Sequence, residues 1–385
     1  MLVPGVRHGL HFPRVLGRLL FAALVVAGVV GAWAVFAPGR VSTDGEAFPY
    51  SPIADVRSIA YIEPIDGRDH VMVRGSATGS EPLSVYSFDV AISGLHARGS
   101  ASPNARTLAI LSSGTQSFAR MTLLTISGAR VDALPVIGSF DHLSTIAWAP
   151  DSSRLTAVKT VSTLEGPGAV DVIEVNAFSG ESRVVTTVER ARNVATVGYS
   201  IDGTRLFWVV VNNAGSNLWM ERAGEVTRVA ELSPGRTADW SLSPDGSRLA
   251  FVDVLGASSR SFVGRTLAIA TGTITTMPSN GNQLGSVWRP GAVLPEFGGP
   301  GGSLQLSEPD DTSAYIRPER WSPQGDLVVA TSFGAGSDRY APLNQSLELG
   351  SPDHREVITE TAGASFLGWV RDLDSYSELE PTIWQ

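Results

Sequence analysis

The sequence predicts an all-β fold, a ring of small antiparallel sheets known as a β-propeller, preceded by one apolar segment long enough for a transmembrane helix. Three observations carry this prediction. A turn motif of the Ser-Pro-Asp-Gly type recurs along the chain, and its copies are spaced like propeller blades. The 385 residues include 40 Gly and 23 Pro, which favours many turns over long helices. The hydrophobic share of 43% is ample for a buried core.

The first element is the uncharged segment 19–37, which begins with Leu19 and ends with Ala37. As a helix rising about 1.5 Å per residue it would be roughly 28 Å long, close to the thickness of the bilayer core. Three arginines precede it, namely Arg7, Arg14 and Arg18. Positive charge stays on the cytoplasmic side, so we expect a single-pass anchor with the large C-terminal part outside the cytoplasm. A small-x-small pattern around Trp33 leaves a cleaved signal peptide as the alternative.

The domain boundaries follow from composition. Residues 1–18 are the expected cytoplasmic segment. Residues 38–52 are polar and interrupted by Gly and Pro, which is typical of a tether. Residues 53–385 hold the repeats and form the expected extracytoplasmic domain. The chain has no Cys, which excludes disulfides and thiol chemistry. Its net charge of −9 argues against nucleic acid as a partner, because an acidic surface repels phosphates.

Each repeat consists of an apolar stretch, a turn and a strand that begins with Arg-Leu or a similar pair. The clearest copies are WSLSPDGSRLAFVDV (240–254), IAWAPDSSRLTAV (146–158), VGYSIDGTRLFWVVV (197–211) and RWSPQGDLVVAT (320–331), with weaker copies at 97–111 and 286–294. Pro fixes φ in the turn, Asp bonds to the backbone beyond it, and Gly accepts a positive φ. Aromatic and β-branched residues flank the turn and suit half-buried strands. One such sheet cannot bury both faces, so the sheets must stack radially.

The spacing of the turns supports the same architecture. The Pro-equivalent positions are Pro103, Pro150, Ile201, Pro244, Pro290 and Pro323. Their separations are 47, 51, 43, 46 and 33 residues, against a period of about 40–45 for four-stranded propeller blades. The motif resembles the Pro-Asp repeat of the TolB-type, WD-like β-propellers, over most of residues 53–385. The resemblance implies a bacterial binding or scaffolding propeller outside the cytoplasmic membrane, and it implies no single activity.

The number of blades depends on how the ring closes. Residues 55–62 resemble the second half of the motif without a preceding inner strand, and residues 366–370 resemble an inner strand with little after it. Together they predict one blade made from both ends of the domain, which gives seven blades. Six blades remain the alternative if the degenerate copy at 288–318 merges with a neighbour.

No motif of known catalytic chemistry is found. There is no G-x-S-x-G elbow and no H-E-x-x-H site, so we expect no catalytic residue, no metal and no cofactor. Four histidines of the domain are expected to be solvated in turns or at strand ends, namely His70, His96, His142 and His354. The motif Trp residues are expected to pack between blades. The alternative function is a propeller enzyme, such as a lactonase, lyase or glycan-acting protein. Two or more His beside Asp or Glu at the mouth of the central channel would favour it.

The predicted function is therefore a protein-binding or scaffolding module, with an accessory subunit of a membrane complex as one form of it. Loops held by a rigid scaffold carry binding residues disproportionately. The connections between the second and third strands of each blade lie on the face opposite the Pro-Asp turns, and they vary most. The candidate partner-binding residues there are Gln116, Arg120, Glu165, Asn212, Asn213, Arg260, Arg265, Arg339 and Tyr340.

Overall fold

The computed structural model describes residues 56–114, 118–127, 130–136, 138–163, 166–256, 261–279, 281–304, 306, 314–334 and 345–371. These residues form strands and turns, and no helix occurs among them. None of the described segments is a helix long and apolar enough to span a bilayer. The expected anchor at 19–37 and the tether at 38–52 lie outside the described residues.

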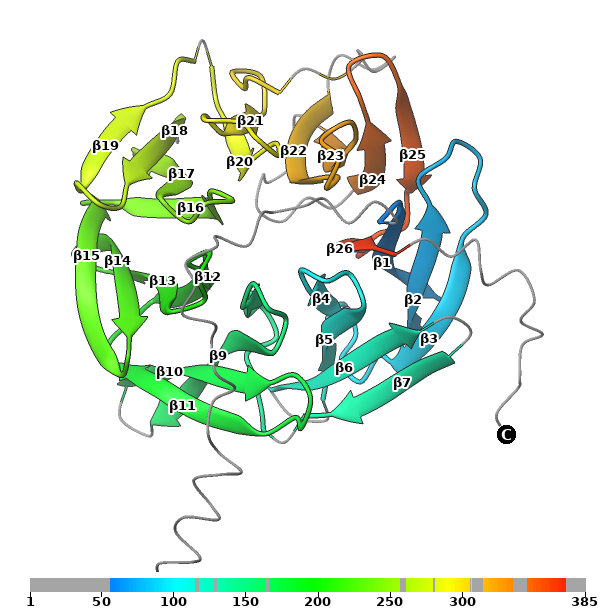
Figure 1. Ribbon diagram of the computed structural model, residues 1–385, viewed down its shortest axis with the longest axis horizontal. Helices are drawn as coiled ribbons and strands as arrows, with labels where there is room; N and C mark the ends of the chain where they lie inside the picture. The colour runs from blue at the N-terminus through cyan, green and yellow to red at the C-terminus, as the bar shows by residue number, and fades with distance from the viewer. Residues whose placement is uncertain are drawn as a thin grey trace, which may run out of the picture. The chain divides into compact units, whose positions relative to one another are not determined.

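The strands form a ring of antiparallel sheets, as predicted (Figure 1). In the order inner to outer, three of the four-stranded sheets are β26 (Ser365–Val370), β1 (Ser58–Ile65), β2 (Arg68–Gly75), β3 (Leu83–Asp89); β4 (Arg98–Ala101), β5 (Thr107–Ser113), β6 (Ala119–Ser127), β7 (Arg130–Pro135); and β8 (Ala147–Trp148), β9 (Arg154–Thr163), β10 (Gly166–Asn176), β11 (Ser182–Val188). The other three are β12 (Asn193–Tyr199), β13 (Arg205–Asn212), β14 (Gly215–Arg222), β15 (Glu225–Ser233); β16 (Arg236–Leu242), β17 (Arg248–Leu255), β18 (Ser261–Ala268), β19 (Thr273–Thr276); and β22 (Ala314–Trp321), β23 (Val328–Gly334), β24 (Gln345–Gly350), β25 (Arg355–Thr359).

The propeller therefore has six four-stranded blades among the described residues, and the prediction of seven complete blades is wrong. Between the blades that begin with β16 and β22 lies a two-stranded sheet of β20 (Leu284–Val287) and β21 (Glu296–Gly298). This is the copy that the sequence marks as degenerate. Three prolines (Pro290, Pro295, Pro300) interrupt the segment, and proline cannot donate to a strand ladder.

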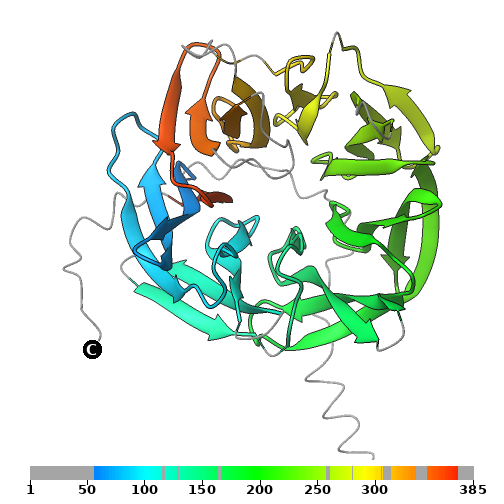
Figure 2. The ribbon, with the colours of Figure 1, turned by 180° about the vertical axis from the view of Figure 1, so that it is seen from behind.

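Strand pairing between the two ends of the domain closes the ring, as predicted. β26 pairs antiparallel with β1, with Ile59 opposite Trp369 and Ser58 opposite Val370. Both face-on views show the red β26 beside the blue β1 (Figures 1 and 2). Closure removes the open edge that β1 would otherwise present to solvent.

The Pro-Asp turns join the inner strand to the second strand in five of the six blades, and the chain ends supply these two strands in the sixth. The residue at the Gly position has a positive φ in five copies: Ala105, Ser152, Gly203, Gly246 and Gly325. In the degenerate copy the residue with a positive φ is Gly291, which stands at the Asp position. In the clearest copy Ser243 Oγ donates to Asp245 Oδ1 (2.5 Å) and accepts from the amide of Arg248 (2.9 Å). The motif residues thus bond to one another and to their own backbone. Their role is structural.

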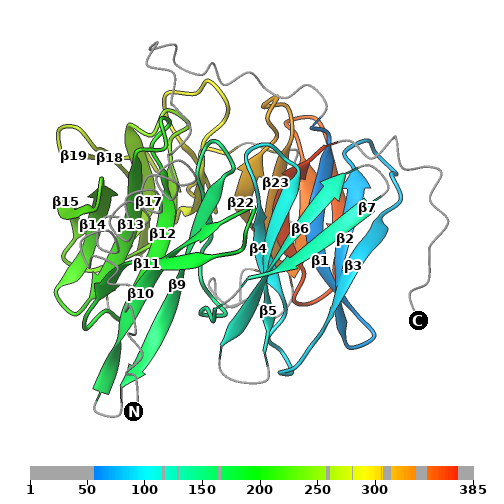
Figure 3. The ribbon, with the colours of Figure 1, turned by 60° about the horizontal axis from the view of Figure 1, so that its bottom comes forward.

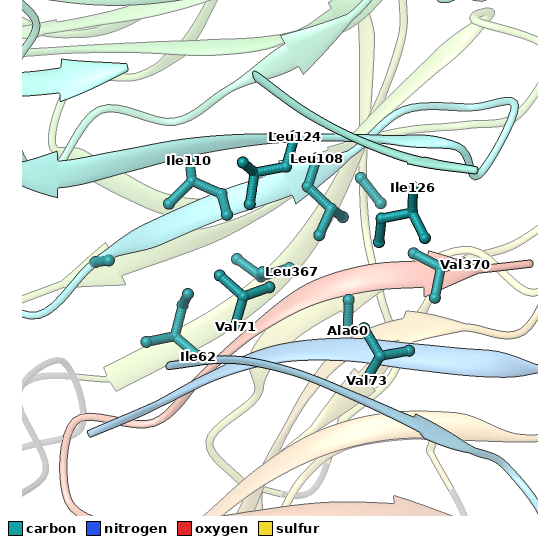
Figure 4. Packing of buried hydrophobic residues seen from close by; sticks show 12 residues of the cluster. Ala60, Ile62, Val71, Val73, Leu108, Ile110, Leu124, Ile126, Leu367 and Val370 are labelled. Atoms are coloured by element: carbon teal, nitrogen blue, oxygen red, sulfur yellow. The ribbon is translucent and has the colours of Figure 1, made fainter. Parts of the chain in front are cut away.

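The core lies between blades. One cluster joins Ala60, Ile62, Val71 and Val73 of the first blade to Leu108, Ile110, Leu124 and Ile126 of the next, with Leu367 and Val370 from β26 (Figure 4). Motif tryptophans also link blades: Trp148 Nε1 donates to the Ser100 carbonyl (3.1 Å) and Trp288 Nε1 to the Ser241 carbonyl (3.2 Å). The strands run between the two faces of the ring, so their connections gather on those faces (Figure 3).

Candidate functional site at the centre of the ring

The predicted binding residues are only partly within the described chain. Gln116, Glu165, Arg260, Arg339 and Tyr340 lie outside the described residues. Arg120 lies in β6 opposite Ser112 and is exposed. Asn213 is exposed in the two-residue connection between β13 and β14, while Asn212 Oδ1 accepts a hydrogen bond from the Ala214 amide (2.8 Å) and so shapes that turn.

Arg265 does not lie in a connection, which corrects the sequence-based placement. It is a residue of β18 opposite Phe251, and its Nη2 pairs with Asp253 Oδ2 at 3.1 Å. The Asp253 side chain is 2% exposed and also accepts from Ser233 Oγ (2.7 Å). A buried carboxylate needs such partners because its desolvation is costly. Arg265 therefore stabilises the blade from within.

Charged side chains instead converge on the axis of the ring. We call Arg98 of β4, Asp239 of β16, and Arg317 and Glu319 of β22 the axial cluster. Asp239 Oδ2 accepts from the Gly285 amide of β20 (2.8 Å), and a Cβ at Gly285 would lie 2.9 Å from Arg317 Cγ. Gly285 therefore leaves room for Asp239 and Arg317 from two non-adjacent inner strands to come together.

Asp239 also has an unusual backbone. Its φ is +52°, at an irregularity in the pairing of β16 with β17. A left-handed conformation is uncommon for residues other than Gly, and such strain gathers at functional sites. Burial raises the pKa of the Asp239 carboxyl, and the nearby Arg317 guanidinium and the Gly285 amide offset this only in part. The local fold therefore holds an acid at the axis in an environment that disfavours its charge.

The arginines of the axial cluster differ in their partners. Arg317 Nη2 pairs with Glu319 Oε1 (3.2 Å), which also accepts from Thr331 Oγ1 (2.7 Å). Arg98 forms no hydrogen bond or ion pair with another described residue and is exposed. Desolvation, followed by the charge of Arg317, lowers the pKa of Arg98, while Glu319 raises it. Arg98 and Arg317 thus repel each other, and Glu319 is paired with Arg317 while it acts on Arg98 only through its charge.

A second group lies where the inner strands begin, and it corrects the expectation that all four histidines are solvated, since His354 is exposed but His142 is buried. His96 Nδ1 bonds to Asp69 Oδ1 (2.8 Å), and Asp69 Oδ2 accepts from the Ala97 amide (2.6 Å). His142 is 9% exposed, and neither ring nitrogen has a hydrogen-bond partner. Burial, and after it the charge of Arg98, lowers the pKa of His142, while the backbone of His96 and the charge of Asp69 oppose this in part. We call Asp69, His96 and His142 the histidine group.

The two groups could bind a charged segment or transfer a proton, and the described residues contain no set of three or more His, Cys, Asp or Glu arranged to hold a metal ion. Sequence reasoning missed the axial cluster because it searched the connections, and it named His96 and His142 without placing them together. One signal was present: Arg98, Asp239 and Glu319 each stand a few residues before the Pro-Asp turn of their copy. A charge at that point lies on an inner strand, which faces the axis.

No protein-family model matches the sequence, and no curated protein matches it either. Solved structures with a similar fold include the propeller domain of the Trilobed protease of Pyrococcus furiosus (10% identity, TM-score 0.53, 79% of this chain and 95% of that chain). The acylaminoacyl peptidase of Pyrococcus horikoshii is another (12%, 0.52, 79% and 51%). TolB of Acinetobacter baumannii is a third (15%, 0.49, 80% and 66%).

This chain thus spans about half of that peptidase and just under two thirds of that TolB. At these identities the likeness concerns the fold. The Trilobed protease domain is described as having an open Velcro topology, whereas β26 and β1 close the ring here. The chain therefore has the β-propeller fold of these peptidase domains, and TolB proteins are among its structural neighbours.

Proposed function

We propose that this chain is a membrane-anchored propeller that binds a protein partner outside the cytoplasm, as an accessory subunit of a membrane complex. The axial cluster carries the proposal. Arg98, Asp239, Arg317 and Glu319 come from three inner strands, and their charges act on one another at the axis. Packing alone would favour an apolar group at Asp239, because burying its charge costs free energy. A rigid closed ring that keeps such charges in place is suited to recognise a charged partner segment.

The binding test uses the full chain with an affinity tag, extracted from native membranes in mild detergent. We expect a specific protein to copurify with the wild type and to be lost from Arg98→Glu, which reverses the one axial charge without a direct partner. Arg130→Glu is the matched control, since Arg130 is 79% exposed on the outer strand β7. Equal recovery of the same proteins with Arg98→Glu would contradict binding at the axis.

The membrane orientation has its own test. Because Arg7, Arg14 and Arg18 flank the apolar segment on one side, we expect residues 1–18 in the cytoplasm and the propeller outside. Protease added to intact spheroplasts should then digest the propeller or its tether while cytoplasmic control proteins stay intact. Protection of the propeller under those conditions would overturn the orientation.

A second candidate function is an enzyme, and the histidine group favours it. Asp69 holds His96 in one orientation, as a carboxylate does for a histidine that transfers protons, and Arg98 lies two positions further along the chain. The test measures hydrolysis of sugar lactones and eliminative cleavage of polyuronates by the purified chain. Turnover that disappears in His96→Asn and Asp69→Asn supports the enzyme. Rates equal to those of buffer for both substrate classes contradict these two reactions.

A further inference from the structure

The starting point is His142, whose two ring nitrogens have no hydrogen-bond partner although the residue is 9% exposed. A buried polar group left unpaired costs about 1–3 kcal/mol, so native structures keep few of them without a reason. The connection that carries His142 is firmly held. Asp141 accepts from Thr160 N and Oγ1 (2.7 Å each), and Ser144 Oγ accepts from the Val158 amide (2.8 Å). The backbone on both sides of His142 is therefore held in place, while the ring nitrogens keep no hydrogen-bond partner.

Arg98 presents the complementary feature on the neighbouring inner strand. It is the first residue of β4, whereas His142 precedes β8, and inner strands of successive blades begin on the same face of the ring. The two strands are in contact, since Trp148 of β8 donates to Ser100 of β4 (3.1 Å). Arg98 makes no hydrogen bond to a described residue, and Glu319, whose charge reaches it, is already bound by Arg317 and Thr331. Two donors on adjacent blades thus lack an acceptor.

We propose that Arg98 and His142 form a binding subsite for a single carboxylate, supplied by an acidic side chain or chain terminus of the partner. A guanidinium binds a carboxylate through two parallel hydrogen bonds, and an imidazole N–H adds a third. His96 is not available for this role through Nδ1, which is bonded to Asp69. That the natural ligand belongs to a protein partner rests on the proposed function. The ability of Arg98 and His142 to bind a carboxylate does not depend on that function.

The charge of the surroundings selects a monoanion over a phosphate. Arg317 is neutralised by Glu319, and burial together with Arg98 keeps His142 in its neutral form by lowering its pKa. Arg98 is the cation of the axial cluster that no carboxylate of the described residues binds, so its single charge meets the ligand. It balances one carboxylate, whereas a phosphate dianion would remain half neutralised beside the Asp69 side chain, which also acts on His142. The domain is acidic overall, which adds to the penalty for a dianion.

The test follows the imidazole nitrogens by NMR in the full-length protein in detergent, with four probes: acetate, acetyl-triglycine with a free carboxylate, the same peptide with its C-terminus amidated, and inorganic phosphate. We expect acetate and acetyl-triglycine to shift the His142 resonances with saturation, and the amidated peptide to have no effect. If acetyl-triglycine binds more tightly than acetate, the carboxylate of the natural ligand belongs to a peptide. If the two bind equally, the natural ligand is a small free acid, which contradicts a partner protein as its source. Phosphate binding at least as tight as acetate overturns the carboxylate assignment.

Variants locate the binding. Arg98→Gln should weaken acetyl-triglycine about tenfold or more, the value of a charge-assisted hydrogen-bond pair, while Arg98→Lys keeps the charge and should lose less. Arg130→Gln, which removes the same charge at the outer rim, should leave affinity unchanged. If Arg98→Gln does not fold, the affinity for acetyl-triglycine is measured instead in Arg98→Lys and in His142→Phe, and both should bind it more weakly than the wild type. Unaltered affinity in Arg98→Gln, or no His142 shift with either carboxylate, overturns the subsite.

The outcomes for the subsite and for the proposed function are separable. Carboxylate binding that depends on Arg98, in a chain from which no partner copurifies, supports the subsite and contradicts the proposed function. A partner that still copurifies with Arg98→Gln, although acetate no longer binds, contradicts the link between the subsite and the partner.

Discussion

Trp369 tests whether closure of the ring stabilises the domain. It lies in β26 opposite Ile59 of β1, is 5% exposed, and packs in a cluster with Tyr61 and Val329. That cluster joins the first blade to the last. We therefore expect Trp369→Ala to destabilise the whole propeller, because it removes the largest side chain that β26 contributes to the core.

The magnitude follows from the buried surface. A tryptophan buries about 150–250 Å², which at about 25 cal/mol per Å² corresponds to roughly 4–6 kcal/mol. The Nε1 of Trp369 has no hydrogen-bond partner, which already costs the native state about 1 kcal/mol or more. The expected loss for Trp369→Ala is therefore about 3–5 kcal/mol, within the range for large aromatic truncations. Trp369→Phe keeps most of the packing and removes the unpaired N–H, so it should stay within about 1 kcal/mol of the wild type.

The assay is urea unfolding followed by circular dichroism and tryptophan fluorescence. Phe178→Ala is the matched control, because Phe178 is 78% exposed and its loss should change stability by less than about 0.5 kcal/mol. Truncation after Gly363 removes β26 altogether and should lower the melting temperature and increase aggregation, since β1 then becomes an open edge. A soluble truncated domain that melts like the wild type, together with a Trp369→Ala loss below about 1 kcal/mol, would refute the reasoning.

Three further predictions concern turns, titration and buried charge. Gly246→Val should lower the free energy of unfolding by about 1–3 kcal/mol, because φ is +68° and the new Cβ would lie 3.1 Å from the backbone of the preceding blade. Gly272 has the same φ with open space around it, so Gly272→Val should cost less in the same thermal melts. Equal losses for the two variants would contradict a contribution from the contact with the preceding blade. Asp239→Asn should stabilise the protein at neutral pH and have no such effect below the pKa of an unfolded aspartate. The pKa of the Asp239 carboxyl is raised in the folded state, so the wild type loses stability as the pH rises through that folded-state pKa. If Asp239→Asn and the wild type differ in melting temperature by the same amount at neutral pH and below the unfolded pKa, this explanation is contradicted. Asp253→Ala should destabilise by about 2–3 kcal/mol, because Arg265, 27% exposed, is left without its carboxylate; a urea midpoint equal to that of the wild type would show that the pair is dispensable.

The fold was predictable because its signals are local. The turn residues from Ser243 to Gly246 bond within a few positions of one another, so their geometry follows from the identities of neighbouring residues. The apolar runs that follow each turn likewise define the strands, and the two half-motifs at the chain ends identify β1 and β26 as partners. The degenerate copy could be recognised from its prolines, but the close approach of β21 to β22 could not. It requires Gly298, where a Cβ would lie 2.1 Å from the Ile316 carbonyl oxygen.

The candidate site was not predictable in the same way. Reasoning from loops named Arg265, which the fold pairs internally with Asp253, and it treated His142 as solvated, although that side chain is buried. Burial of an isolated polar residue leaves no mark in its neighbouring sequence. The positions of Arg98 and Asp239 just before their turns would have predicted that both lie on inner strands.

The sequence by itself determined the repeats, the turns, the all-β class and the joining of the chain ends, because each depends on residue types at short, recurring intervals. The tertiary structure alone decided which side chains meet at the axis. Arg98, Asp239 and Arg317 belong to separate repeats, and their distances from one another depend on the number of blades, the bulge in β16 and the absence of a side chain at Gly285. These are properties of the closed ring, in which the electrostatic coupling of distant residues is set by geometry that no single repeat contains.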